Sequence, residues 1–226
     1  MDANRIRREI VDVVKREYAC GMVNMFEGNA SARLGDRVFI TPSQVSKEAM
    51  TTEMVVETDL EGNILYLPEG LKPTSELTMH LAVYRIRPDV RAVIHNHSLY
   101  ATAFAMCRRP IRSDALTEMN MTFGEVPLIP YGTPGTPAIH AGFEEGLGNY
   151  RAVLLENHGV LTMGRTMELA YSYAEGVEKI AQQLLIAEQL GTPVPIPREE
   201  AEMLRANASV MRDREIAAAL AEDGTE

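Results

Sequence analysis

The chain has 226 residues, of which 46% are hydrophobic, and its formal net charge is −10. This length suits one α/β domain with a sizeable core. The acidic balance leaves no basic patch of the kind that binds nucleic acid, so an anionic ligand would have to meet a local positive field. No stretch approaches the roughly 20 apolar residues that a membrane span needs, and we therefore expect no membrane contact.

The N-terminus and the cysteines predict a cytoplasmic protein. Residues 1–10 read MDANRIRREI, which is charged and lacks the apolar segment of a signal peptide. The two cysteines, Cys20 and Cys107, do not stand in C-x-x-C spacing and suit no disulfide framework. A small molecule is the expected partner.

In the first half of the chain, the sequence predicts two strand pairs, with one helix before them and one helix after them. In order, the expected elements are a helix within 4–21, strand pairs within 30–43 and 54–68, and a helix within 73–88. Either Thr74 or Ser75 would cap the last of these helices, and Pro88 follows its end.

The second half alternates strands with helices and then becomes helical. In order, we expect a buried strand over 90–97, a helix over 98–108, a strand, loop and helix within 124–148, two strands within 151–164, and helices over 167–191 and 198–221. Strands interleaved with helices indicate an α/β domain with helices on both faces of a sheet. Without an internal repeat or a linker, residues 1–226 are expected to form a single domain.

Three histidines stand at the ends of two predicted strands. His95 and His97 are two residues apart in a strand, so their side chains point to the same face. His158 ends another strand and precedes Gly159, which permits a close backbone approach. Three imidazoles at two strand ends fit a catalytic metal site with an open position. The alternative is that they are polar residues where strands meet solvent, and the sequence alone does not make the strands neighbours.

A carboxylate and several hydroxyls are further candidates. Glu76 lies in the first turn of the helix predicted over 73–88, where an acidic residue also complements the helix dipole. Thr74 and Ser75 are either caps or part of a phosphate cradle. We interpret His80, four residues after Glu76, as a hydrogen-bonded helix histidine. Turn residues that suit a phosphate contact are Gly28, Asn29, Ser31 and Ser43.

Six motifs together resemble the class II aldolase/adducin family. They are GNASAR (28–33), ITPS (40–43), PTSELTMH (73–80), AVIHNHSLYATAFA (92–105), PYGTPGT (130–136) and LLENHGVLTMG (154–164). One such motif is a weak signal, but six in the family's order and spacing are specific. The resemblance implies a domain of this family's type over 1–226, with a three-layer α/β/α fold and a central, mostly antiparallel sheet. It also implies a homotetramer with sites at subunit interfaces.

The resemblance implies roles for single residues as well. His95, His97 and His158 would bind one Zn²⁺, or another divalent ion, per subunit. Glu76 would ligate the resting metal and act as the acid/base. The residues implied to hold the substrate phosphate are Gly28, Asn29, Ser43, Gln44, Thr74 and Ser75. The implied reaction is reversible cleavage of a ketose 1-phosphate, of the fuculose, rhamnulose or deoxypentulose type, to dihydroxyacetone phosphate and an aldehyde through a metal-stabilised enediolate.

One stretch departs from the pattern of the family's fuculose-phosphate aldolases. Residues 110–120 and the C-terminal helix both lack a tyrosine that those enzymes carry. Glu118 lies in this stretch, in a setting similar to the acid/base glutamate of methylthioribulose-1-phosphate dehydratases, although it also suits a surface carboxylate. A sugar-phosphate 4-epimerase or such a dehydratase is therefore one alternative. A non-catalytic, adducin-like interaction module is the other.

Overall fold

We describe the protein from a computed structural model, in which residues 2–223 are described. Within these residues, eight strands form one sheet in the order β4-β3-β2-β1-β5-β8-β7-β6. The strands are β1 (Asn29–Leu34), β2 (Arg37–Ile40), β3 (Val56–Asp59), β4 (Ile64–Tyr66), β5 (Ala92–Asn96), β6 (Leu128–Ile129), β7 (Ala152–Leu155) and β8 (Gly159–Gly164). Neighbours are antiparallel except for β6 and β7, which are parallel. The expected mostly antiparallel sheet is confirmed.

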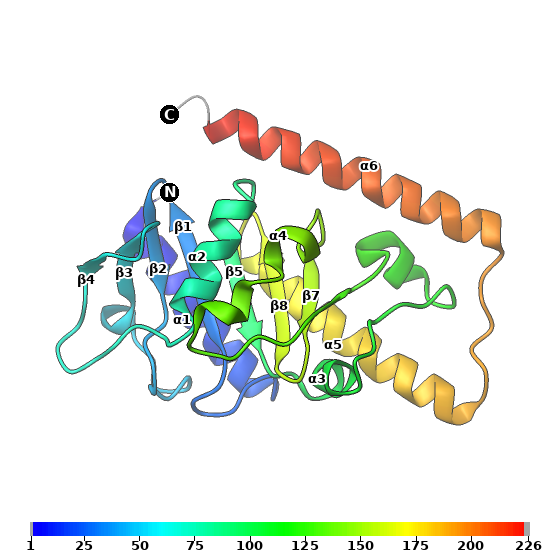
Figure 1. Cartoon of the computed structure of the whole chain (residues 1–226), viewed down its shortest axis with the longest axis horizontal. Coiled ribbons are helices and arrows are strands. Elements are labelled where there is room, and N and C mark those ends of the chain that lie inside the picture. The colour runs from blue at the N-terminus through cyan, green and yellow to red at the C-terminus, as the bar shows by residue number, and fades with distance from the viewer. Residues whose placement is uncertain (1, 224–226) are drawn as a thin grey trace.

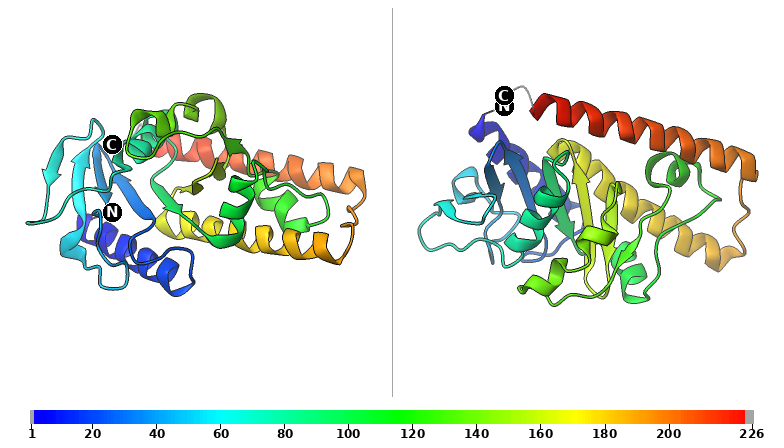
Figure 2. Two further views of the ribbon diagram at one scale, coloured as in Figure 1. Left: turned by 60° about the horizontal axis from the view of Figure 1, so that its bottom comes forward. Right: turned by 45° about the horizontal axis from the view of Figure 1, so that its top comes forward.

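Helices cover both faces of this sheet (Figures 1 and 2). They are α1 (Ala3–Ala19), α2 (Leu77–Ile86), α3 (Leu99–Met106), α4 (Phe143–Gly146), α5 (Met167–Leu190) and α6 (Arg198–Asp223). Short turns of 3₁₀-helix are η1 (Thr52–Met54) and η3 (Pro137–His140), and η2 (Met119–Phe123) is a π-helical turn. Helices α1, α3 and α5 pack on one face, whereas α2 and α4 pack on the other. The three-layer α/β/α arrangement is therefore confirmed.

Side chains that alternate along β5 pack into the hydrophobic cores on both faces of the sheet. Val93 belongs to the core cluster on the α2 face, and Ala92 and Ile94 belong to the cluster formed with α1 and α5. Every residue of β5 is buried. Since successive strand side chains point to opposite faces, the side chain of His95 shares the α2 face with that of Val93.

Helix α2 begins later than the sequence predicts, and helix α3 is capped by a residue of another helix. Helix α2 starts only at Leu77, so Glu76 stands at its N-cap position rather than in its first turn. The hydroxyl of Thr74 accepts a hydrogen bond from the backbone N–H of Glu76 at 3.3 Å, which orders the turn before the helix instead of capping it. Helix α3 follows Ser98 as expected, but its first amides are capped by a carboxylate from α5.

The C-terminal helix α6 runs back along the molecule in the direction opposite to α5 (Figure 1). The guanidinium of Arg205 on α6 donates to Asp114 at 2.5 Å and to Asn120 at 2.7 Å, which ties the helix to the segment around η2. Cys20 and Cys107 are free and exposed. Among the described helices, none is both long and apolar enough to cross a membrane.

Gly159 generates a prediction, because the backbone of the β7–β8 hairpin lies close to the end of β5 there. A Cβ atom at this position would lie 2.4 Å from the carbonyl oxygen of Asn96 and 2.8 Å from Cδ2 of His97. Gly159→Ala should push the hairpin away from β5 and lower the free energy of unfolding by about 1–3 kcal/mol. Urea denaturation measures this change.

The matched control is Gly176→Ala on α5. There the nearest atoms to an added Cβ belong to the ring of Phe123, at 3.3 Å, and alanine favours a helix over glycine by about 1 kcal/mol. The control should therefore cost clearly less free energy of unfolding than Gly159→Ala. Equal losses in the two variants would contradict the close approach at Gly159.

Candidate metal centre

Three histidines converge at one end of the sheet. His95 lies near the end of β5, His97 follows that strand, and His158 lies in the turn between β7 and β8. Strands β5 and β8 are hydrogen-bonded neighbours, with His95 opposite Leu161. One ligand nitrogen from each of the three rings lies within 4.8 Å of the others. The two strand ends that the sequence singled out are thus adjacent.

The carboxylate of Glu76 faces this cluster. Its Oε2 lies 3.3 Å from Nε2 of His95, and its Oε1 lies 3.2 Å from Nε2 of His158. The residue is 7% exposed, and Oε1 is buried without a hydrogen-bond partner. Because an unsatisfied buried polar atom costs roughly 1–3 kcal/mol, and more when it is charged, this oxygen suits a site that holds a cation.

Hydrogen bonding sets the tautomer of His95. Its Nδ1 lies 2.9 Å from the carbonyl oxygen of Val160. A carbonyl oxygen only accepts, so Nδ1 carries the proton and donates. The lone pair is then on Nε2, which faces Nε2 of His97 at 3.0 Å and the carboxylate of Glu76. This is the arrangement in which a backbone carbonyl orients a metal-binding imidazole.

Burial favours the neutral form of two of these rings. The pKa of His95 is lowered well below its ordinary value, first by burial and then by the neighbouring His158 and His97. Burial also lowers the pKa of His158, although the carboxylate of Glu76 opposes that shift. Metal ligation needs neutral imidazoles, so the fold favours the state that binds an ion.

The donor set fits a divalent transition-metal ion. Imidazole nitrogens and a carboxylate oxygen are ligands that zinc accepts, and catalytic zinc sites pair three protein ligands with an open position. His95, His97 and His158 would hold the ion, and the unpartnered Oε1 of Glu76 lies close enough to join them.

A series of buried polar side chains stands behind Glu76. The amide nitrogen of Asn29 donates to Oε2 of Glu76 at 2.8 Å. The amide oxygen of Asn29 lies 2.5 Å from Nε2 of His80, and Nδ1 of His80 lies 2.7 Å from the hydroxyl of Ser31. The interpretation of His80 as a hydrogen-bonded helix histidine is confirmed.

The candidate phosphate residues come from three segments that lie side by side near the centre. Residues 28–29 run into β1, where Asn29 is paired with His95 of β5. Residues 41–44 follow β2, and the N–H of Thr41 donates to the carbonyl oxygen of Ala30 in β1 at 3.1 Å. Residues 72–75 are bonded to residues 41–44, since the N–H of Ser43 donates to the carbonyl oxygen of Lys72 at 2.8 Å.

Two of these candidates have left-handed backbones. Gly28 has a φ of +71°, and a Cβ there would lie 2.9 Å from the carbonyl oxygen of His95, so this contact requires glycine. Gln44 has a φ of 57° and an exposed side chain. A non-glycine residue in this region is uncommon and often marks a functional turn. Ser75 is exposed, whereas Thr74 is buried.

Glu118 is not brought to the centre of its own chain. It stands just before η2 with an exposed side chain, and within residues 2–223 it has no hydrogen bond or ion pair with the histidines or with Glu76. Its segment is held by α6 through Arg205. A catalytic role for Glu118 stays a prediction.

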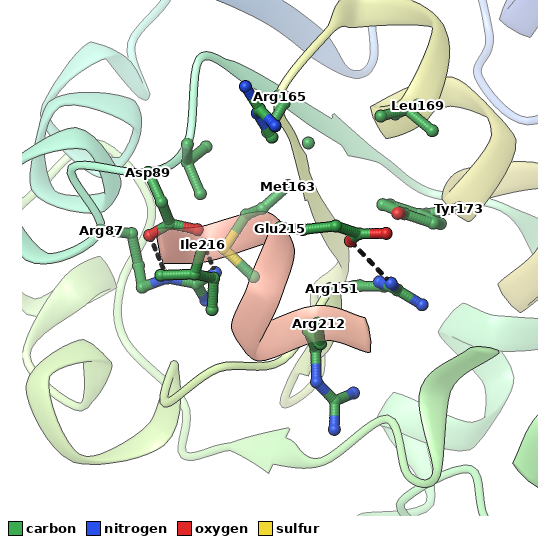
Figure 3. A pocket seen from close by; sticks show the side chains of 12 residues that line it. Arg87, Asp89, Arg151, Met163, Arg165, Leu169, Tyr173, Arg212, Glu215 and Ile216 are labelled. Carbon is green, nitrogen blue, oxygen red and sulfur yellow. Dashed lines mark hydrogen bonds and ion pairs between the residues drawn. The ribbon is translucent and has the colours of Figure 1, made fainter. Parts of the chain in front are cut away.

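A hollow lies at the ends of β5, β7 and β8 opposite to the histidines, next to α6 (Figure 3). Arg87 forms an ion pair with Asp89 at 2.7 Å, and Arg151, just before β7, forms one with Glu215 of α6 at 2.9 Å. The second of these ion pairs joins α6 to the residue that precedes β7. We therefore interpret the hollow as a packing cleft.

His80 generates a prediction about acid stability. Burial lowers its pKa to about 3 from 6.5, with His95 acting in the same direction and Glu76 against it. As the pH falls below 6.5, the unfolded chain takes up the proton first, so stability is lost between about pH 6.5 and 3. The loss is at most roughly 1.4 kcal/mol per pH unit.

His80→Gln should flatten this dependence, because the variant has no imidazole to protonate on unfolding. Urea denaturation at about pH 7, 6 and 5 gives the slopes. His140→Gln in η3, away from the buried network, is the control and should keep the wild-type slope. Parallel slopes for wild type and His80→Gln would contradict the assignment.

Comparison with known proteins agrees with this geometry. A family model described as the Class II Aldolase and Adducin N-terminal domain matches residues 8–185. An L-fuculose phosphate aldolase of Escherichia coli O6:H1 is 34% identical over 202 residues, which are 88% of this chain and 92% of the relative. A 5-methylthioribulose-1-phosphate/5-deoxyribulose-1-phosphate aldolase of Escherichia coli O45:K1 is 34% identical over 206 residues, or 90% and 93%.

A solved structure of an L-fuculose 1-phosphate aldolase matches the fold with a TM-score of 0.82 at 29% identity. The match covers 89% of this chain and 95% of that chain. The family match therefore includes the sheet, the histidine cluster and Glu76. The chain belongs to the class II aldolase and adducin family.

Proposed function

We propose that this protein is a zinc-dependent aldolase that cleaves a ketose 1-phosphate reversibly to dihydroxyacetone phosphate and an aldehyde. The observation that carries the proposal is the meeting of Glu76 with His95, His97 and His158 in one partly buried cluster. Zinc is the first choice for one ion per subunit because three imidazoles with an open position are typical of its catalytic sites. Another divalent ion on the same ligands is the alternative.

The phosphate end of the substrate is assigned to the three neighbouring segments. Turns with free backbone amides and hydroxyls form anion sites without a basic side chain, which suits an acidic chain. The residues assigned to this role are Gly28, Asn29, Ser43, Gln44, Thr74 and Ser75. The backbone N–H groups of Ser43 and Thr74 already donate to Lys72 and Thr41, so these two residues would contribute their hydroxyls. Holding the phosphate away from the reacting bond would orient the substrate.

Glu76 is assigned the proton transfer. A bound metal would supply Lewis-acid polarisation of the substrate oxygens. Oε2 of Glu76 is anchored by Asn29, whereas Oε1 has no hydrogen bond and is free to exchange a proton with the dihydroxyacetone phosphate carbon. Acid–base catalysis of this kind is typically worth about 10²–10⁴ in rate.

Among the three substrate types, we favour a deoxypentulose 1-phosphate. Residues 110–120 lack the tyrosine expected in a fuculose-phosphate enzyme, which suits a less polar aldehyde. A relative with 34% identity is named for 5-methylthioribulose 1-phosphate and 5-deoxyribulose 1-phosphate. Both observations point to an aldehyde half with fewer hydroxyls.

We further infer a cytoplasmic homotetramer whose sites lie at subunit interfaces, with residues 1–226 as one domain. Glu118 is exposed and apart from the centre of its own chain. This placement suits a residue that reaches the centre of a neighbouring subunit. There it would act on the aldehyde half, as a second acid/base.

The alternative on the same site is a dehydratase or a 4-epimerase. The setting of Glu118 favours the dehydratase, but the retained Glu76 favours the aldolase. The adducin-like module is disfavoured because its heads lack the metal residues that this chain has. Metal analysis of the purified protein separates the module from the enzymes, since absence of a bound divalent ion would contradict both enzymatic proposals.

The deciding experiment assays zinc-loaded protein for release of dihydroxyacetone phosphate. The panel is fuculose, rhamnulose, 5-deoxyribulose and methylthioribulose 1-phosphates. We expect the two pentulose derivatives to be cleaved with the higher kcat/KM. A dehydrated product without dihydroxyacetone phosphate would overturn the aldolase proposal in favour of the dehydratase.

Glu76→Gln should fold normally and lose at least about 10²-fold in kcat, because an amide cannot carry the proton. Glu144→Gln on α4 makes the same chemical change away from the centre and is the matched control. Steady-state kinetics with circular dichroism measure activity and folding. A rate near that of the control would refute the role of Glu76.

Glu118→Gln should lower kcat by about 10²-fold if the residue is the second acid/base. The expected loss depends on assembly, so the oligomer is verified by light scattering in the same samples. Unchanged kcat in an intact oligomer would make Glu118 a surface carboxylate.

A further inference from the structure

A continuous series of hydrogen bonds runs through the core from α2 to the centre. The hydroxyl of Tyr84 lies 2.7 Å from that of Ser31, which lies 2.7 Å from Nδ1 of His80. Nε2 of His80 lies 2.5 Å from the amide oxygen of Asn29, whose nitrogen donates to Glu76 at 2.8 Å. All five residues are buried, with exposures between 0% and 7%.

The chemistry of the five groups gives the series one direction. The carboxylate of Glu76 accepts, so Asn29 must present its N–H₂ there and its oxygen to His80. That oxygen also only accepts, so Nε2 of His80 donates. A neutral imidazole then has its lone pair on Nδ1, which accepts from the hydroxyl of Ser31. The remaining hydroxyl, that of Tyr84, donates to Ser31.

Burial supports this proton arrangement. The pKa of His80 is lowered to about 3, mainly by burial, which keeps the ring neutral at physiological pH. Burial likewise raises the pKa of Tyr84, so its hydroxyl keeps its proton and can donate. Every donor in the series therefore points toward Glu76.

We propose that Tyr84, Ser31 and His80 form a positioning relay that acts through Asn29 to fix the orientation of the Glu76 carboxylate. The relay anchors Oε2 and thereby leaves Oε1 turned toward the histidines. This inference rests on the proposed function in taking Glu76 as the proton carrier and metal neighbour. The simpler alternative is that the three residues only provide hydrogen-bond partners for one another inside the core.

His80 offers two conservative variants that separate these cases. In His80→Gln the side-chain nitrogen occupies the place of Nε2 and keeps the donor to Asn29. In His80→Asn the amide reaches only the place of Nδ1, so the partner of Ser31 is retained and the donor to Asn29 is lost. Both variants put one amide into the same buried position.

The first readout is the binding of Co²⁺ to metal-free protein, which is monitored through the visible absorption of the bound ion. Partners that orient metal-site residues typically change metal affinity or activity by about 10–100-fold. We expect His80→Asn to raise the Kd for Co²⁺ by about tenfold or more, and His80→Gln to stay well below tenfold. Equal Kd values for the two variants would overturn the relay.

The second readout is catalytic and uses zinc-loaded protein. His80→Asn should lower kcat and shift the acid limb of its pH profile by more than it raises KM, because Asn29 is one of six residues assigned to the phosphate whereas it is the direct partner of Glu76. His80→Gln should restore both. A rise in KM alone would overturn the proposal, since it would place the effect on substrate binding.

A hydroxyl deletion at the far end of the relay keeps the test decisive if a His80 variant does not fold. Tyr84→Phe removes only the terminal donor, and Tyr171→Phe removes a hydroxyl from an equally buried ring on α5 that bonds to Glu175 instead. We expect the first variant to weaken Co²⁺ affinity by less than about tenfold, as in His80→Gln, which also disconnects Tyr84 from Asn29, and the second to keep a wild-type value. Identical affinities would exclude Tyr84 from the relay and overturn the proposal.

The Co²⁺ titrations need no substrate, so they distinguish failure of the relay from failure of the proposed function. If no ketose 1-phosphate is cleaved while the variants differ in Kd as expected, the aldolase proposal fails and the relay stands. If cleavage is observed while the variants bind Co²⁺ alike, the relay fails and the aldolase proposal stands.

Discussion

Strand β5 is hydrogen-bonded along both of its edges, and the whole centre depends on that double pairing. On one edge, β1 places Asn29 opposite His95. The segments 41–44 and 72–75, which are assigned to the phosphate, are bonded to β1 and to each other on this side. On the other edge β8 brings the turn that carries His158. A strand paired on both sides cannot slip by one residue without turning its side chains to the opposite faces. The backbone ladder thus fixes the histidines relative to one another.

The layer on the far face of the sheet also holds the centre in place. Asn96 points away from the histidines and donates to Glu17 of α1 at 2.9 Å. Burial raises the pKa of Glu17 to about 8. Glu178 of α5 accepts from the N–H groups of Tyr100 and Ala101, at 3.0 and 2.9 Å, just after His97. Helices on the opposite face of the sheet therefore restrain the backbone that carries the cluster.

Local patterns predict most of this structure, and tertiary pairing accounts for what they miss. The period of two in β5 correctly placed His95 on one face, and glycine after His158 correctly indicated a close approach. The contact of Asn29 with Glu76 joins residues 47 positions apart and has no local signature. The late start of α2 was also missed, because Thr74 and Glu76 have the composition of a normal helix start but are recruited into the turn.

The buried Glu76 carboxylate has a consequence for the electrostatics of the whole molecule. With imidazoles in the neutral form that ligation requires, the four side chains sum to one negative charge inside a chain of net charge −10. A divalent cation inverts the sign of that spot to plus one, while the surrounding surface stays acidic. Attraction for an anionic substrate is then confined to loaded molecules and to distances of about a Debye length, near 8 Å at physiological salt.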